Sequence, residues 1–112
     1  MDLIKKKCVP CEGGTSPLSL STIQVYCKQI IDWKVVEDNK KIQKIFILPG
    51  FKKAMVLVNH IADIAEEEGH HPDIHIFYKK VVIELWTHAI NGLSENDFIV
   101  AAKIDSLDLS LN

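Results

Sequence analysis

The chain contains the stretch FKKAMVLVNHIADIAEEEGHHP at residues 51–72. Its apolar residues recur at intervals of three and four, the spacing that places side chains on one face of a helix. These residues are Phe51, Ala54, Met55, Val58, Ile61, Ala62 and Ala65. Pro49-Gly50 stops the segment before it, and Gly69 suits the left-handed position that ends a helix. The stretch therefore predicts a central helix over about residues 51–68.

Runs rich in β-forming residues flank this helix on both sides. Before it, residues 33–37 and 42–47 are separated by Asp38-Asn39, a pair that tolerates positive φ. After it come residues 74–78 and 81–87, and apolar residues alternate along the second of these runs. Each pair of runs predicts a β-hairpin.

A first helix is expected before the first hairpin. Ser19 or Ser21 can cap it, and Ser21-x-x-Gln24 matches a capping box. Apolar residues at helical spacing then predict that this helix ends near Ile31. Residues 1–17 have no sustained periodicity and contain several glycines and prolines, so we expect a loop-like N-terminal arm there.

A third helix is expected after the second hairpin. Asn91-Gly92 breaks the chain, and Ser94 and Asp97 then match the acidic form of a capping box at the start of a helix that runs to about Leu107. The element order is helix, two strands, helix, two strands, helix, with connections short enough for antiparallel hairpins. We therefore predict an α+β fold, with a four-stranded antiparallel sheet and three helices on one face, as one domain over residues 18–112.

The central helix carries a second apolar line, formed by Val56, Leu57 and Ile64. This line lies away from the main stripe and would be left in water on a monomer. We expect it to form a subunit interface. The alternative is that the N-terminal arm covers it.

The composition restricts the classes of function. The chain has 112 residues and a formal net charge of -2, and its 13 basic residues are all lysines. Without the guanidinium forks of arginine, direct nucleic-acid binding is disfavoured. No apolar run resembles a signal-peptide core or a membrane span. We expect a soluble, intracellular protein with no membrane association, most simply in the cytoplasm, and leave a nuclear or organellar location open.

The three cysteines are Cys8, Cys11 and Cys27, an odd number that argues against a complete disulfide framework. Cys8-Val9-Pro10-Cys11 has the spacing of a redox motif, but no helix follows it to lower a thiol pKa. It also lacks the second pair of ligands that a structural zinc site needs. We expect free thiols in a mobile arm.

Three histidines carry the clearest chemical signal. His70 and His71 leave the central helix on a turn, and His88 follows the last predicted strand, where it can meet them. Imidazole exchanges protons near neutral pH and also binds metals, so both kinds of site stay open. Glutamates 66–68 lie where the helix dipole disfavours negative charge. We expect Glu66 to support an imidazolium or a ligand, and Glu67 and Glu68 to be solvated.

These residues resemble those of the pterin-4a-carbinolamine dehydratases, over about residues 18–107. The resemblance rests on the Glu-x-x-x-His-His-Pro and Thr-His-x-x-x-Gly-Leu-Ser motifs, and on Tyr78, Val81, Leu85, Asp97, Ala101 and Ile104-Asp105. It implies dehydration of 4a-hydroxytetrahydropterin to quinonoid dihydropterin, in the recycling of the cofactor of aromatic amino-acid hydroxylation. It also implies that neither a metal nor a bound cofactor takes part.

The resemblance further implies roles for individual residues. His70 and His88 are expected to be the acid–base pair, with His71 chiefly holding the pterin and Thr87 helping to bind it. Glu66 would orient the pterin or its neighbouring histidines. Four further residues are expected to belong to the binding site. They are Asp97 in addition to its capping role, Trp86 as a ring surface, and the turn residues Gly69 and Pro72.

Two alternatives come from other classes of protein. One is a metal-dependent hydrolase, in which the three histidines would be metal ligands. The other is an interaction protein, since some animal relatives act as dimerisation cofactors for a homeodomain transcription factor. The resemblance also implies a homodimer joined through sheet edges or a homotetramer formed through central helices, and the sequence does not choose between them.

Overall fold

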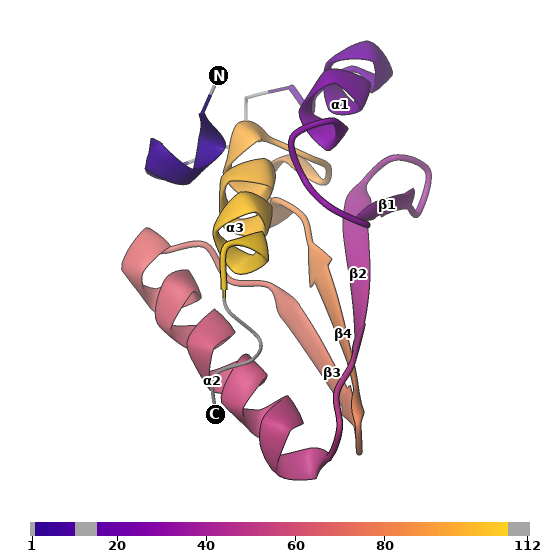
Figure 1. The fold of residues 1–112 in the computed structure, drawn as a ribbon. Coiled ribbons are helices and arrows are strands. Elements are labelled where there is room, and N and C mark those ends of the chain that lie inside the picture. The colour runs from indigo at the N-terminus through magenta and orange to yellow at the C-terminus, as the bar shows by residue number, and fades with distance from the viewer. Residues whose placement is uncertain (1, 11–15, 108–112) are drawn as a thin grey trace.

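The structure is a computed structural model that describes residues 2–10 and 16–107 (Figure 1). Its elements follow the predicted order of helix, two strands, helix, two strands, helix, with two short 3-10 helices added. They are η1 (Leu3–Lys5), α1 (Leu20–Cys27), β1 (Lys34–Val36), β2 (Lys41–Ile47), α2 (Phe51–Glu68), β3 (Asp73–Phe77), β4 (Lys80–Leu85), η2 (His88–Ile90) and α3 (Glu95–Asp105). The predicted α+β class is confirmed.

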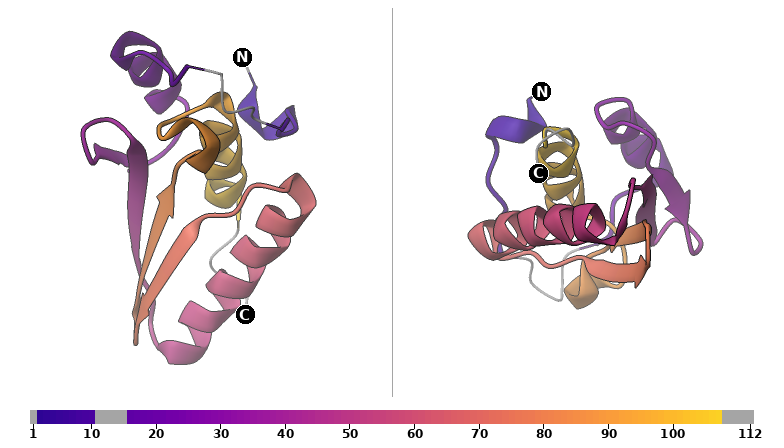
Figure 2. Two further views of the ribbon diagram at one scale, coloured as in Figure 1. Left: turned by 180° about the vertical axis from the view of Figure 1, so that it is seen from behind. Right: turned by 60° about the horizontal axis from the view of Figure 1, so that its bottom comes forward.

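The two hairpins join into one antiparallel sheet with strand order β1-β2-β4-β3. Alternate residues of the central strands β2 and β4 face the core, because side chains of a strand point to opposite faces in turn. The fully buried residues of these strands are Ile42, Val81, Ile83 and Leu85. Helices α2 and α3 lie on this side of the sheet (Figures 1 and 2), and Tyr26 of α1 stacks on Phe98 of α3.

The antiparallel pairing of β3 with β4 decides where the site forms. Asp73, the first residue of β3, is paired with Glu84, the second-last residue of β4. The chain that leaves α2 and enters β3 therefore lies beside the chain that leaves β4. This register brings residues 70–72 close to residues 86–88, as the sequence predicted for the three histidines.

Helix α2 has the predicted bounds, and it ends at Gly69, whose φ of 66° lies in the left-handed region. The prediction that Leu57 belongs to a second apolar line left in water is wrong, because Leu57 is only 2% exposed and belongs to the core. Ile64 packs against the same core, and Val56 is half-buried. The buried face is wider than one stripe, because α2 contacts both the sheet and α3.

Helix α1 is shorter than predicted, since it ends at Cys27 rather than near Ile31, and Ser19 rather than Ser21 caps its first turn. The chain turns after α1 because tertiary contacts take over from helical hydrogen bonds. The N–H of Ile31 donates to Asp105, and Asp32 has a positive φ of 62°. This turn buries Ile30 and Trp33.

Strand β4 ends at Leu85, two residues earlier than predicted, so His88 does not stand at a strand end. Thr87 forms an isolated bridge with Gly92 instead of pairing with a neighbouring strand. The chain between them forms η2, and Asn91 closes it in the left-handed conformation, with a φ of 51°. His88 is therefore presented on a closed loop.

The N-terminal arm packs against α3 over the part that the structure describes, and it is not the loose loop that its composition predicts. Leu3 of η1 is 2% exposed and belongs to the core. Lys6 forms a hydrogen-bonded ion pair of 2.9 Å with Glu95, at the start of α3. Within residues 2–10 and 16–107, no helix has the length and apolar character needed to cross a membrane.

Asp105 ties the end of α3 to two other parts of the fold. Its carboxylate accepts hydrogen bonds from the Ile31 N–H at 2.8 Å, from Trp33 Nε1 at 2.9 Å and from Lys44 Nζ at 2.8 Å. The side chains of Lys44 and Asp105 are 13% and 8% exposed. Because this ion pair is largely shielded from water, removing one partner leaves a poorly hydrated charge.

We expect Asp105→Ala to lower the free energy of unfolding by roughly 3 kcal/mol, because Lys44 and the Trp33 N–H lose their acceptor. Urea unfolding followed by circular dichroism measures the change. Asp63→Ala, which removes an exposed carboxylate from α2, is the control and is expected to stay within about 0.5 kcal/mol. Equal destabilisation by both variants would contradict this role of Asp105.

Candidate active site

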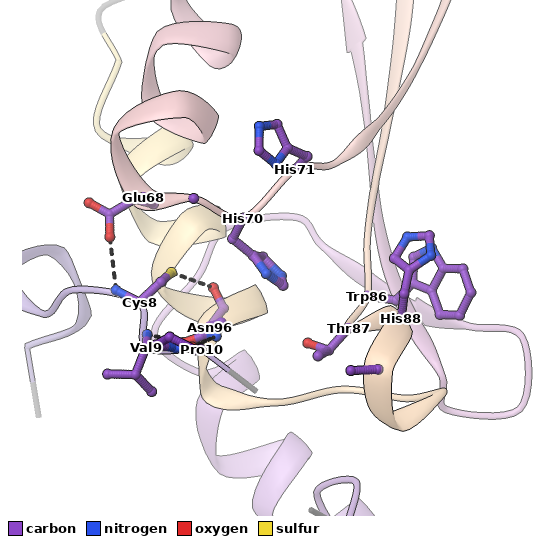
Figure 3. A pocket seen from close by; sticks show the side chains of 12 residues that line it. Cys8, Val9, Pro10, Glu68, His70, His71, Trp86, Thr87, His88 and Asn96 are labelled. Atoms are coloured by element: carbon purple, nitrogen blue, oxygen red, sulfur yellow. Dashed lines mark hydrogen bonds between the residues drawn. The ribbon is translucent and has the colours of Figure 1, made fainter. Parts of the chain in front are cut away.

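A cavity of about 570 Å³ lies where the chain leaving α2 meets the chain leaving β4 (Figure 3). Three segments of the chain form it. One is the turn after α2, the second is the loop after β4, and the third is the N-terminal arm together with the start of α3. The lining residues are Cys8, Val9, Pro10, Glu68, Gly69, His70, His71, Trp86, Thr87, His88, Ala89 and Asn96.

His70 is turned into the cavity by the end of α2. Gly69 takes the left-handed conformation, and the N–H of His70 donates to the carbonyl of Ala65 at 3.2 Å. A Cβ on Gly69 would meet nothing within 4 Å, so glycine is favoured here by its φ and not by lack of space. The His70 side chain is 12% exposed, and its Nε2 lies 2.6 Å from Asp97 Oδ1.

Asp97 is fully buried behind His70, at 0% exposure. Its second oxygen, Oδ2, accepts hydrogen bonds from the Thr87 hydroxyl at 2.8 Å and from the Ser94 N–H at 3.0 Å. The latter bond is part of the predicted capping box of α3. These contacts suit an ionised carboxylate, which only accepts hydrogen bonds. His70 then donates through Nε2–H, and Nδ1 carries the lone pair of the neutral ring.

His71 lies at the exposed rim of the cavity. Its Nε2 is 2.5 Å from Glu66 Oε2, and the two side chains are 62% and 77% exposed. The pair spans the last turn of α2, so Glu66 contacts one of the neighbouring histidines. Solvent screens this pair, and its contribution to stability is small.

His88 and Trp86 form the opposite side of the cavity. Their ring centroids are 3.9 Å apart, with an angle of 33° between the planes. Trp86 is held from behind, because its Nε1–H donates to Asp73 Oδ2 at 3.1 Å and Lys41 lies 5.0 Å from the ring centroid. Trp86 therefore gives the exposed His88 ring a fixed neighbour.

The glycine of the Gly-Leu-Ser motif closes the loop that carries His88. The Thr87 N–H donates to the Gly92 carbonyl at 2.8 Å. A Cβ on Gly92 would lie 2.7 Å from Cβ of Pro17, closer than side chains normally approach. Glycine is therefore required at this position by close packing and not by its φ.

The third side of the cavity was not predicted from the sequence. The Cys8 N–H donates to Glu68 Oε1 at 2.9 Å, and Glu68 also pairs with Lys103 of α3. The Glu68 side chain is 2% exposed, so the expectation that it is solvated is wrong. Asn96 holds Val9 through two hydrogen bonds, as acceptor at 3.1 Å and as donor at 2.6 Å.

Electrostatics make the Cys8 thiol unreactive. Burial, and next the nearby Glu68 carboxylate, raise the pKa of Cys8 to about 12. Burial also raises the pKa of Cys27. Both thiols are therefore protonated at neutral pH and are poor nucleophiles. Cys11, the second cysteine of the Cys-x-x-Cys motif, lies outside the described residues.

The structure places the predicted site residues in two groups. Those that line the cavity are Gly69, His70, His71, Trp86, Thr87 and His88. Glu66 and Asp97 lie behind the lining and contact it through His71 and His70, and Pro72 lies outside it. The lining residues that the sequence did not indicate are Val9, Pro10, Glu68, Ala89, Asn96 and Cys8. Two signals in the sequence concern these residues, the Cys-x-x-Cys arm and the unfavourable position of Glu68 at the end of α2.

The geometry does not favour the metal-dependent hydrolase. Among the residues that the structure describes, no group of three or more His, Cys, Asp or Glu side chains is arranged to hold a metal ion. His70 and His71 instead each face a separate carboxylate, Asp97 and Glu66.

Comparison with known proteins identifies the family. Residues 16–107 match the family described as Pterin 4 alpha carbinolamine dehydratase. A protein of Alkaliphilus metalliredigens named as a pterin-4-alpha-carbinolamine dehydratase is 47% identical over 93% of this chain and 94% of its own. The mitochondrial pterin-4-alpha-carbinolamine dehydratase 2 of Arabidopsis thaliana is 42% identical over 96% of this chain and 60% of its own.

The fold has a counterpart among solved structures. The crystal structure of a transcriptional coactivator/pterin dehydratase from Brucella melitensis superposes with a TM-score of 0.77, at 27% identity, over 81% of this chain and 97% of its own. The family match covers the helices and strands that carry the three histidines. The chain therefore belongs to the pterin 4 alpha carbinolamine dehydratase family and is an enzyme of the hydro-lyase class.

Proposed function

We propose that this chain converts 4a-hydroxytetrahydropterin to quinonoid dihydropterin by histidine acid–base catalysis. The observation that carries the proposal is the pair formed by His70 and the fully buried Asp97, placed at a cavity with His88 on its other side (Figure 3). The Brucella melitensis structure has both a coactivator and a dehydratase in its name. The histidine-lined cavity favours the dehydratase for this chain.

The reaction needs one proton donor and one proton acceptor. The bond between C4a and the hydroxyl oxygen breaks, and the lone pair of N5 forms the C4a–N5 double bond. The departing oxygen takes a proton and leaves as water, while N5 loses its proton. Two imidazoles suit these transfers, because each accepts or donates a proton near neutral pH.

Asp97 decides which nitrogen of His70 takes part. It accepts Nε2–H in the neutral ring and also in the imidazolium, so the proton that is exchanged is the one at Nδ1. Thr87 lines the cavity, but its hydroxyl donates to Asp97. We therefore assign Thr87 and Asp97 as positioning residues for His70. This role differs from the direct pterin binding that the sequence suggested.

His88 and His71 have different surroundings from His70. Both are exposed, so each ring can exchange protons with solvent water. The His88 ring lies against the Trp86 ring, and we assign His88 as the second acid–base group and Trp86 as the residue that positions it. The His71–Glu66 pair at the rim supplies polar groups for the edge of the pterin.

We also propose that the product serves the recycling of a tetrahydrobiopterin cofactor in the cytoplasm.

We further propose that the enzyme is a homo-oligomer. Large apolar side chains are exposed on the edge strand β3 and directly after it, with Ile76 38%, Phe77 60% and Tyr78 66% exposed. An edge strand with such neighbours is a ready surface for pairing with another copy. We expect sedimentation velocity at micromolar concentration to give a dimer or a larger species, and a monomer would contradict this proposal.

We expect His70→Ala and His88→Ala each to lower kcat by roughly 10²–10⁴-fold, because each removes one of the two proton-transfer groups. Stopped-flow absorbance with synthetic 4a-carbinolamine measures the rate. The control is His60→Ala, which removes an exposed histidine of α2 that does not line the cavity. Wild-type rates in both active-site variants would overturn the acid–base assignment.

We expect Asp97→Asn to lower kcat by roughly 10²-fold or more, because an amide NH₂ that faces His70 selects the other tautomer of its ring. Ser19→Ala is the control, since it removes the capping hydroxyl of α1, which does not line the cavity, and keeps the Asp97 carboxylate. We expect this control to cost about 1 kcal/mol of stability with little effect on kcat. The two variants are compared by kcat and by thermal unfolding, and equal losses of kcat would assign Asp97 to a stabilising role alone.

A further inference from the structure

We propose that Cys8–Pro10 of the N-terminal arm form a wall of the substrate cavity that contacts the pterin and sets its affinity. The inference rests on the proposed function and extends it to a segment outside the residues 16–107 that match the family. The wall lies on the other side of His70 from Thr87, Trp86 and His88 (Figure 3). A flat ring held beside His70 then has a neighbour on both sides.

The wall is anchored from several elements. Leu3 is buried in the core, and Lys6 pairs with Glu95 of α3 at 2.9 Å. The Cys8 N–H donates to the buried Glu68 of α2, whose charge is balanced by Lys103. Because α2 and α3 both hold the arm, its position follows that of α2, which ends just before His70, and of α3, which carries Asp97.

Asn96 fixes the backbone of Val9 in a second way. Its side-chain oxygen accepts the Val9 N–H at 3.1 Å, and its Nδ2 donates to the Val9 carbonyl at 2.6 Å. This two-way bond resembles the pairing of one residue with a neighbouring strand. Pro10 adds a restriction of its own, since the residue before a proline favours an extended conformation. The backbone of Val9 is therefore held by two hydrogen bonds with Asn96 and further restricted by the proline that follows it.

The exposure of the side chains argues that this anchoring serves a ligand. Val9 is 64% exposed and Pro10 is also exposed, and both line the same cavity as His70. Ile4 of the same arm is exposed as well, but it does not line this cavity. The hydrogen bonds with Glu68 and Asn96 thus hold the apolar side chains of Val9 and Pro10 at the cavity, where a bound pterin would contact them.

The chemistry of the wall indicates what it recognises. The N–H groups of Cys8 and Val9 and the carbonyl of Val9 are already hydrogen-bonded, and the Cys8 thiol is protonated at neutral pH. The wall therefore offers Val9 and Pro10 as uncharged, apolar surface. It suits the face or an uncharged substituent of a pterin, and a charge placed there would oppose binding.

The test places a charge on the wall with Val9→Asp. We expect the KM for synthetic 4a-carbinolamine and the Kd for an unreactive tetrahydropterin, measured by calorimetry, to rise by about tenfold, which corresponds to about 1.4 kcal/mol of lost binding. We expect kcat to stay within about twofold, because His70 and His88 are untouched. Val9→Ala is a milder second variant, with an expected rise in KM and Kd of a few fold from lost apolar contact.

The control is Ile4→Asp, which places the same charge on an exposed residue of the same arm that does not line this cavity. Its KM, Kd and kcat are expected to match those of the wild type, and thermal unfolding verifies that all variants are folded. An active wild-type enzyme with unchanged KM and Kd in both Val9 variants would overturn the wall and leave the proposed function standing. A wild-type chain that neither dehydrates the carbinolamine nor binds the tetrahydropterin would overturn the proposed function, and the wall with it.

Discussion

The carboxylate of Asp97 is the group on which the rest of the site depends. One of its oxygens accepts from His70, and the other accepts from Thr87 and from the first turn of α3. A buried carboxylate is costly unless donors surround it, so the fold must bring these three segments together for Asp97 to be stable. The capping box that starts α3 and the orientation of His70 are therefore parts of one hydrogen-bond network.

The sheet makes that network possible. Antiparallel pairing of β3 with β4 places the turn after α2 next to the loop after β4, and α3 follows that loop after only a few residues. Local backbone features then aim the side chains. Gly69 turns His70 inward through its left-handed φ, and Gly92 closes the loop beside Pro17 that places His88 in the cavity lining.

Features that depend on local periodicity could be predicted from the sequence, and features that depend on distant partners could not. The bounds of α2, the two hairpins and the capping box of α3 all follow from spacing within one segment. The early end of α1 depends on Asp105, and the loop at His88 depends on Gly92. For the site, the motifs indicated His70, His71 and His88, but the arm residues that complete the cavity are held by hydrogen bonds to Glu68 and Asn96 that no local pattern reveals.

The three glutamates at the end of α2 show how such a distant partner changes a local conclusion. Negative charge at a helix C-terminus costs roughly 0.3–1 kcal/mol per group, which made an exposed, solvated position the simplest expectation. Glu68 is instead buried. Burial alone would raise its pKa, but its hydrogen bonds with Lys103 and the Cys8 N–H hold that pKa below the usual value. The same contacts fix the N-terminal arm at the cavity. The charge of Glu68 is unfavourable at the end of its own helix, and its contacts with Lys103 and the arm explain its position there.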